Sequence, residues 1–125
     1  MDKIFIGPET IEEANVPWTD VFREDFHVIV YKDKYPVTEG HLLFVPKYNS
    51  LAVLTDAFED AVRYGKQMVI EKVWDGFNIG LNAEKAAGQT VMWPHIHLIP
   101  RRNGDVVDPV GGVRNTIPGK GNYRI

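Results

Sequence analysis

The chain lacks cysteine, long apolar runs and excess positive charge. With no cysteine among its 125 residues, it can hold neither disulfides nor thiolate metal sites. No apolar stretch reaches the roughly 18 residues of a membrane span, and residues 1–8 carry both charges without the apolar run of a signal peptide. A net charge of −3 gives no reason to expect nucleic-acid binding. These absences predict a cytoplasmic protein with no membrane or nucleic-acid partner.

What is present fits one ordinary domain. The 44% hydrophobic content is enough for a single core, and the 25% charged content is typical of globular proteins. No internal repeat or low-complexity segment is visible. We therefore expect residues 1–125 to form one domain. From about residue 101 the chain is rich in glycine and proline, which predicts an irregular tail across the surface or against a partner.

The apolar pattern predicts strands on both sides of one long helix. Runs of strand-forming residues predict strands at 26–31, 41–45, 77–82 and 91–99. Residues 56–74 have helical apolar spacing, with Asp56 and Glu59 placed as a capping box and Gly76 placed as a left-handed cap. This order favours an α+β fold with a mostly antiparallel sheet of about five strands.

The segment 88–100 contains the residues most suited to chemistry. Side chains alternate along a strand, so Trp93, His95 and His97 should share one face. A neutral imidazole is a good nucleophile near pH 7 and can form a covalent intermediate. The preceding loop offers backbone N–H groups near Gly88, where no side chain blocks a phosphate. Further hydrogen-bond donors to phosphate are Gln89, Thr90 and Asn82.

Two other interpretations fit the same histidines. They can be structural residues of a half-buried strand. Alternatively, the His-x-His pair can bind zinc or copper with His41 as third ligand, which makes the chain a metal-binding protein through His41, His95 and His97. No further carboxylate or fourth ligand is obvious from the sequence.

The order of several blocks resembles the histidine-triad (HIT) superfamily, whose motif is His-φ-His-φ-His-φ-φ. The resemblance covers about residues 26–123. It rests on residues 36–47, on Asn82, on Gly88-Gln89 followed by the histidines, and on Ile99-Pro100-Arg101. The tail, with Asp108-Pro109, Gly111-Gly112 and Ile117-Pro118, resembles one bacterial branch of HIT hydrolases.

The first triad position departs from this pattern. Counting from Gln89 and from Pro100 places the three triad positions at Trp93, His95 and His97, so a tryptophan replaces the first histidine. Its indole can only donate a hydrogen bond, which puts rate and substrate choice in question. Pro94 removes one ladder N–H, so this part of the strand should be unpaired, bulged or at its start.

The resemblance implies a role for each site residue. His95, the middle member, attacks the α-phosphorus to give a nucleotidyl-histidine that water hydrolyses. His97 holds a phosphate oxygen or the leaving group, and His41 supports the site. Asp33, eight residues before His41, binds the ribose. The phosphate contacts are Asn82, Gly88, Gln89 and Thr90.

Other residues keep two interpretations each. Tyr31 and Phe26 either form the wall of a base pocket or pack in the core, and His27 is structural or on the surface. Arg101 and Arg102 either steer polyphosphate or form a solvated pair.

The resemblance also implies a substrate class and a partner. The HIT-like fold implies a homodimer that joins two sheets into one. The implied activity is hydrolysis or nucleotidyl transfer on a dinucleoside polyphosphate or a nucleoside phosphoramidate. No cofactor is required, although Mg²⁺ can accompany a polyphosphate. Because Trp93 replaces a histidine, a non-catalytic nucleotide-binding module is the alternative.

Overall fold

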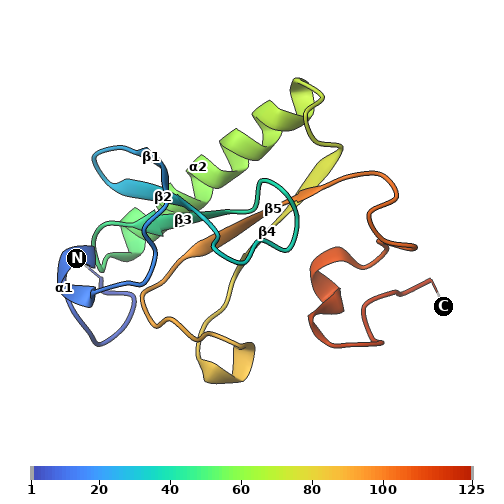
Figure 1. The fold of residues 1–125 in the computed structure, drawn as a ribbon. Helices are drawn as coiled ribbons and strands as arrows, with labels where there is room; N and C mark the ends of the chain where they lie inside the picture. Colours follow the sequence, from blue (N-terminus) through green and yellow to red (C-terminus); the bar gives the residue numbers. More distant parts are fainter. Residues whose placement is uncertain (1, 125) are drawn as a thin grey trace.

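The computed structural model describes residues 2–124 as a five-stranded antiparallel sheet with one long helix (Figure 1). The strand order is β1-β2-β3-β5-β4, so β5 lies inside the sheet and β4 at an edge. This confirms the predicted α+β class. No helix within residues 2–124 is long and apolar enough to cross a membrane. The elements are α1 (Ile11–Ala14), β1 (Val21–Glu24), β2 (Val28–Lys32), β3 (Leu42–Pro46), α2 (Leu51–Ile70), β4 (Gly76–Leu81), η1 (Lys85–Ala87), β5 (Ile96–Arg101) and η2 (Gly112–Thr116).

Helix α2 covers one face of the sheet, but its ends differ from the prediction. It begins five residues earlier than expected, because Ser50 and not Asp56 caps it by accepting a hydrogen bond from Val53 N–H. Its end also differs, because the left-handed residue after the helix is Lys72 (φ 62°), while Gly76 begins β4. The core beneath α2 contains Val28, Val30, Leu42, Phe44, Leu54, Ala57, Ala61, Trp74, Ile96 and Leu98.

Gly65 lets α2 approach the sheet closely. A Cβ at this position would lie 2.9 Å from ring atoms of Phe77 on β4. In an exposed helix, Gly→Ala stabilises by about 1 kcal/mol. Here we expect Gly65→Ala to destabilise the protein by about 1–3 kcal/mol, because the methyl overpacks against the ring. Urea denaturation with the exposed Lys66→Ala as control measures this difference, and a more stable Gly65→Ala protein would contradict the packing.

A second core lies on the opposite face of the sheet. It combines strand residues with Trp93 and with the N-terminal segment, whose Phe5 and Trp18 pack against it. Asn49, only 5% exposed, holds that segment in place. Its side chain accepts from Ile4 N–H (2.9 Å) and donates to the carbonyls of Phe5 (2.9 Å) and Pro8 (3.1 Å). The buried residues of this core are Ile11, Ile29, Tyr31, Leu43, Val45 and Trp93.

The last predicted strand is shorter than expected, and the tail is folded. Residues 91–95 are outside the sheet and β5 begins at Ile96, as the missing N–H of Pro94 favours.

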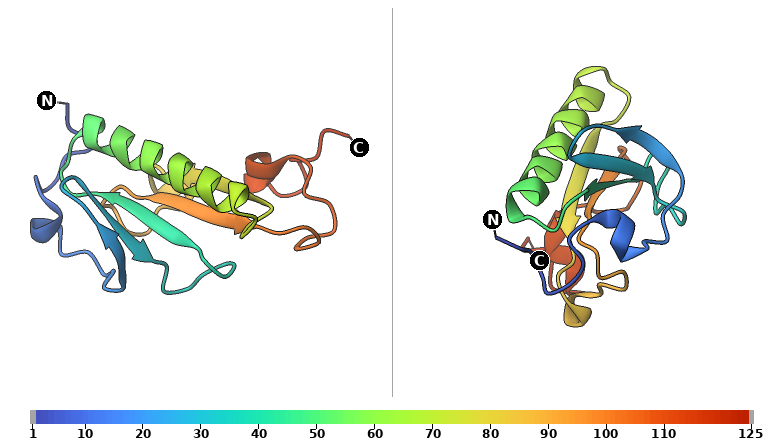
Figure 2. Two further views of the ribbon diagram at one scale, coloured as in Figure 1. Left: turned by 90° about the horizontal axis from the view of Figure 1, so that it is seen from above. Right: turned by 90° about the vertical axis from the view of Figure 1, so that its left-hand side faces the viewer.

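The tail from about residue 102 contains η2, which contacts β4. Figure 2 shows this tail and the N-terminal segment at opposite ends of the molecule.

Candidate active site

His97 lies on the sheet face opposite α2, as predicted from strand alternation, while His95 lies just before β5 with its ring 5.1 Å from that of His97. On β5, Ile96 and Leu98 belong to the core beneath the helix, so His97 between them points to the other face. His97 is paired with Leu43 on β3 and with Gly80 on β4. Glycine at this pair leaves the space beside the imidazole open.

Backbone geometry fixes the proton position on His95. Its Nδ1 lies 2.8 Å from the carbonyl oxygen of Trp93, which can only accept, so Nδ1 carries the proton. Nε2 is then the basic nitrogen with a free lone pair. His95 is only 8% exposed, yet it lines a cavity of about 420 Å³ together with Gly88 and Thr90. The imidazole is therefore covered but not sealed from a ligand.

Trp93 points into the protein and is absent from the lining of this cavity. It is 3% exposed, its indole N–H donates to the carbonyl of Pro46 (2.9 Å), and its ring meets Phe5 edge-on at 5.8 Å. The tryptophan at the first triad position is thus a core residue whose carbonyl orients His95.

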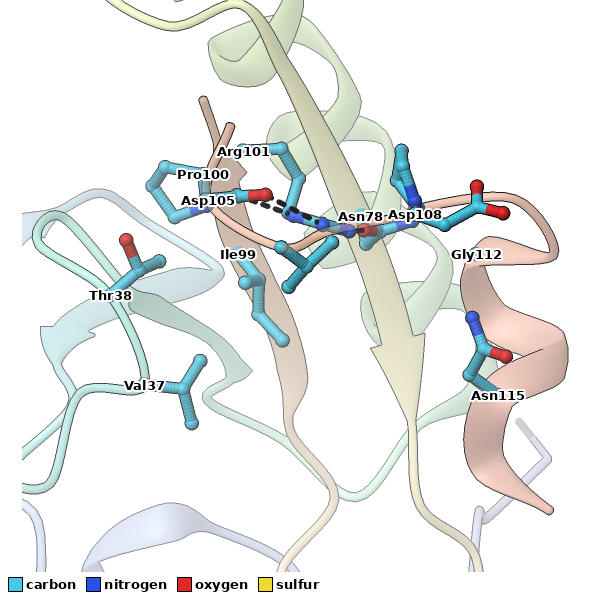
Figure 3. Close-up of a pocket in the computed structure, with 12 residues that line it drawn as sticks. Val37, Thr38, Asn78, Ile99, Pro100, Arg101, Asp105, Asp108, Gly112 and Asn115 are labelled. Carbon is cyan, nitrogen blue, oxygen red and sulfur yellow. Dashed lines mark hydrogen bonds and ion pairs between the residues drawn. The ribbon is translucent and has the colours of Figure 1, made fainter. Parts of the chain in front are cut away.

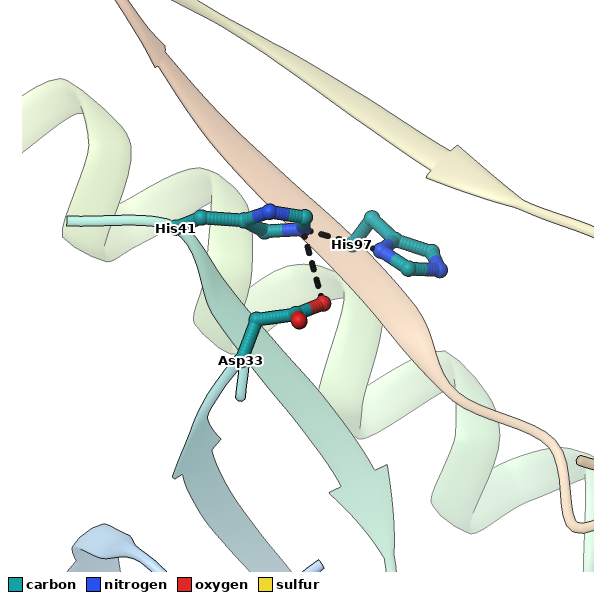
Figure 4. Close-up of side chains that lie close together, drawn as sticks. All are labelled: Asp33, His41 and His97. Carbon is teal, nitrogen blue, oxygen red and sulfur yellow. Dashed lines mark hydrogen bonds and ion pairs between the residues drawn. The ribbon is translucent and has the colours of Figure 1, made fainter. Parts of the chain in front are cut away.

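His41 sets the opposite proton position on His97 (Figure 4). Val37 N–H donates to His41 Nδ1 (3.2 Å), so the proton of neutral His41 sits on Nε2. That Nε2 lies 3.0 Å from His97 Nδ1, which therefore accepts, and His97 carries its own proton on Nε2. Asp33 Oδ2 lies 3.4 Å from the same His41 nitrogen. His41 was predicted to support the site, and the structure shows it in contact with both His97 and Asp33.

The same contacts bear on metal binding. Ligand atoms of Asp33, His41 and His97 lie within 4.8 Å of one another, which differs from the predicted set because Asp33 replaces His95. A metal there would need the lone pair of His41 Nε2, and this nitrogen holds a proton as long as Val37 donates to Nδ1. The arrangement therefore fits a hydrogen-bonded relay better than a metal centre.

Burial keeps these histidines neutral. Burial lowers the pKa of His41 and of His95 below the usual 6.5. Asp33 partly opposes this shift for both residues, and the Trp93 carbonyl also opposes it for His95. The pKa of His97 falls to about 4, because burial acts together with the neighbouring His95 and His41. At pH 7 the site therefore offers one imidazole lone pair and one imidazole N–H donor.

This pKa shift predicts the acid limb of activity. The sequence predicts that His95 is a nucleophile, and a protonated His95 has no lone pair, so the predicted activity should fall as pH drops through its lowered pKa. We expect kcat/KM against pH to have its acid half-point below 6.5, with no change in His27→Ala, whose side chain is 48% exposed near Asp56. An acid half-point at or above 6.5 would contradict the prediction that His95 is the nucleophile.

The loop before the histidines corrects two predicted phosphate contacts, those of Gln89 and of the Gly88 N–H. The side chain of Gln89 binds within the loop: Oε1 accepts from Glu84 N–H (2.8 Å), and Nε2 donates to the carbonyls of Val91 and Met92 (3.2 Å each). It has no donor left for phosphate. The N–H of Gly88 is also used, by Lys85 O (2.9 Å), while its φ of 88° makes the turn that glycine allows. Both residues shape the loop.

The other predicted residues do meet at the cavity. Asn82 and Thr90 line it, and their side-chain donors have no acceptor among residues 2–124. Asp33 also lines it, with Oδ1 accepting from Tyr35 N–H (2.8 Å). Lys34 adds a positive charge at the same wall.

Comparison with known proteins identifies the family. The family model described as the HIT domain matches residues 15–104. The chain belongs to the HIT family. An uncharacterized HIT-like protein of Methanocaldococcus jannaschii is 36% identical over 102 residues, covering 76% of this chain and 79% of that protein.

Two further HIT relatives are informative. The adenosine 5′-monophosphoramidase of Saccharomyces cerevisiae is 38% identical over 80 residues, which are 58% of this chain and 48% of that protein. The crystal structure of a zinc-bound histidine triad family protein from Mycobacterium smegmatis superposes with a TM-score of 0.64 at 31% identity. The superposed region covers 70% of this chain and 69% of the Mycobacterium smegmatis protein.

Trp18 lies at the site of this HIT domain but was not predicted as part of it. Trp18 stands edge-on to the His95 ring at 4.7 Å and contacts Tyr31 at 5.7 Å. Phe26 is 81% exposed and lines no part of the His95 cavity, so neither of its two interpretations, base-pocket wall or core residue, fits the structure. The only sequence signal for Trp18 is an aromatic residue in an otherwise polar stretch.

The paired arginines are structural rather than solvated. Arg102 donates to Thr38 Oγ1 (2.8 Å) and to the carbonyl of Glu39 (2.9 Å), which closes the turn that carries Val37. Arg101 makes a two-point ion pair with Asp105. Neither guanidinium is free to steer polyphosphate.

Proposed function

We propose that this protein is a HIT hydrolase that cleaves nucleoside 5′-phosphate derivatives at the α-phosphorus. The observation that carries the proposal is the opposite proton placement on two adjacent histidines. His95 presents a bare Nε2, and His97 presents an N–H on Nε2. One ring can attack phosphorus while the other donates a hydrogen bond to a phosphate oxygen or to the leaving atom.

In this proposal the other lining residues hold the substrate. Asp33 accepts hydrogen bonds from the ribose hydroxyls, and Asn82 and Thr90 donate to the phosphate oxygens. Gln89 and Gly88 act indirectly by fixing the loop that carries Thr90. Trp18 covers one side of the His95 ring.

The proposed reaction has two steps, attack by His95 and then attack by water. His95 Nε2 bonds to phosphorus as the bond to the leaving group breaks, and the leaving atom takes a proton from solvent. Water then attacks phosphorus, the bond to His95 breaks, and water's proton returns to solvent. The products are a nucleoside monophosphate and the free leaving group.

The yeast relative supports a phosphoramidate substrate, and a dinucleoside polyphosphate stays the second candidate. The imidazole nucleophile needs no metal, and Mg²⁺ would be needed only to screen a polyphosphate.

Incubation with adenosine 5′-phosphoramidate or with diadenosine tetraphosphate tests the proposal. We expect release of AMP from at least one of them, detected by chromatography, in wild type and in the exposed-histidine control His27→Ala. Measurable binding of intact substrate with no AMP would instead favour the non-catalytic nucleotide-binding module.

Two assembly predictions belong to the same proposal. We propose a homodimer in the cytoplasm, formed through one of the two sheet edges, β1 or β4. Sedimentation equilibrium should give twice the monomer mass of 14.2 kDa, and a single-chain mass would contradict the dimer.

A further inference from the structure

A cavity of about 780 Å³ lies next to the end of α2. Its lining includes Met68 of α2 and Val73 just beyond the helix, neither of which lines the cavity of His95. Its volume is within the range of small-molecule sites, about 300–1,000 Å³. Asp33 and His41 line both cavities, so the two spaces are neighbours. We call this second space the helix cavity.

The indole N–H of Trp74 faces the helix cavity without an acceptor. Trp74 is 5% exposed and lines the cavity, and no residue among 2–124 accepts a hydrogen bond from its Nε1. No fully buried side-chain nitrogen or oxygen in this part of the chain lacks a partner, so the unpaired N–H keeps access to the open space. The buried Trp93, by contrast, donates to the carbonyl of Pro46. A covered but unpaired donor in a cavity is a place for an acceptor atom of a ligand.

Gly40 leaves the edge of this indole uncovered. A Cβ at position 40 would lie 3.6 Å from Trp74 Nε1, and Gly40 itself lines the helix cavity. Its φ of 92° is one that glycine adopts easily. Both the turn and the access to the N–H therefore depend on a residue without a side chain.

Three aromatic rings line the helix cavity in a row from the core to the surface. The rings of Tyr64 and Trp74 meet edge-on at 5.8 Å, and those of Phe22 and Tyr64 meet edge-on at 5.6 Å. Trp74 is buried and Phe22 is exposed, so the row leads outward from the unpaired N–H. Such a wall packs favourably against a planar aromatic body.

The charges of the lining balance. The charged residues are Asp20, Lys32, Asp33, Lys34, Glu39 and Arg102, three of each sign. Asp33 contacts His41, and Arg102 is bonded to the 38–39 turn. Lys32 and Asp20 lie side by side, because Lys32 N–H donates to the carbonyl of Asp20 (2.8 Å), and neither side chain forms an ion pair within residues 2–124. Neighbouring free charges of opposite sign suit a ligand that carries both an ammonium and a carboxylate group.

The cavity between the sheet and the tail does not share these features. There the guanidinium of Arg101 is already taken, because it donates to the carboxylate of Asp105 and to the side chain of Asn78 (Figure 3). The helix cavity, in contrast, combines an unpaired buried donor, an aromatic wall and two unpaired charges.

We infer that the helix cavity binds a small aromatic zwitterion, a molecule of the kind that aromatic amino acids represent. An acceptor on its ring receives the N–H of Trp74, and the ring lies along Tyr64 and Phe22. Its carboxylate meets Lys32 and its ammonium group meets Asp20. These five residues have no part in the proposed reaction, so the inference stands apart from the proposed function.

An NMR titration of isotope-labelled protein with L-tyrosine tests where the ligand binds. The chain has three tryptophans, and Trp74→Phe and Trp18→Phe assign their indole N–H signals. We expect L-tyrosine to shift the Trp74 signal and to leave the signal of Trp93, which is bonded to Pro46, unchanged. A shift confined to Trp18 would place the ligand in the cavity of His95 and overturn the inference, as would the absence of any shift up to the solubility limit.

Three analogues in the same titration test the ligand class. L-phenylalanine lacks the ring acceptor, tyramine lacks the carboxylate, and hydroxyphenylpropionate lacks the ammonium group. Each should bind at least about fivefold more weakly than L-tyrosine, because each leaves one protein group without its partner. An analogue that binds as tightly as L-tyrosine would contradict the inferred class.

Val73→Trp and Ile70→Trp are a matched pair of variants. Both residues are exposed near the end of α2, but only Val73 lines the helix cavity, so both proteins should fold. An indole at position 73 occupies part of the cavity and should weaken binding of L-tyrosine at least about tenfold, while Ile70→Trp should bind like wild type. Equal binding by the two variants would show that L-tyrosine binds elsewhere.

Discussion

Replacing His95 by alanine is expected to lower kcat/KM for a nucleoside phosphoramidate by at least about 10³-fold, because the variant has no nucleophile for the first step. His95 lines the cavity, and its Nε2 has a free lone pair because its Nδ1 donates to the Trp93 carbonyl. Removing it leaves only substrate positioning and hydrogen-bond donation. Activity is measured as initial AMP release at saturating and at low substrate.

Two further variants, His97→Ala and His27→Ala, give the losses of activity with which His95→Ala is compared. His97→Ala should lose less, about 10²-fold, because it removes a donor and keeps the nucleophile. His27→Ala should match wild type, since its exposed ring lies near Asp56 outside the cavity. A His95→Ala enzyme with activity similar to His97→Ala would remove His95 from the role of nucleophile.

Trp93→Ala is expected to give the largest loss of stability, about 3–5 kcal/mol in the free energy of unfolding. The indole is 3% exposed, packs on Phe5 and donates to the carbonyl of Pro46. Its removal opens a cavity in the core that also contains Leu43 and Val45, and it leaves the Pro46 carbonyl without its donor. Urea denaturation followed by circular dichroism measures the change.

The neighbouring Met92→Ala is the matched control, because Met92 is 47% exposed and its loss should change stability by less than about 0.5 kcal/mol. Trp93→His, which restores the family motif, should also destabilise the protein, since imidazole neither fills this space nor reaches the cavity. A Trp93→His protein with wild-type stability and higher kcat/KM would show instead that the tryptophan only weakens a conventional triad.

Local patterns in the sequence were enough to predict the face of the sheet that carries the site. Alternation along a strand depends only on backbone geometry, so the face of His97 was predicted correctly. His95 lies beside it, with ring centroids 5.1 Å apart, although it precedes the strand that was predicted to contain it. The predicted helix was correct in kind but not in its start, because both Ser50 and Asp56 are suitable caps. The sequence alone does not show that residues 51–55 pack on the sheet, with Val53 and Leu54 buried.

Side-chain partners far apart in the chain could not be predicted. The proton on His97 is set by His41, 56 residues away, and His41 is set in turn by Val37. The turn that carries Val37 is closed by Arg102, 64 residues beyond Thr38. Gln89 matched the family pattern but uses its amide within the loop, which only coordinates reveal. Spacing identifies which residues gather, whereas tautomers depend on tertiary contacts.

Rapid quench of the enzyme with adenosine 5′-phosphoramidate in alkaline denaturant, followed by peptide mass spectrometry without an acid step, tests the central claim most directly. We predict an adenylyl group on the imidazole of His95, formed before AMP appears and absent from His95→Ala. An adduct located on His97, or AMP formed in a single step with oxygen from labelled water and no adduct at any time, would contradict nucleophilic attack by His95.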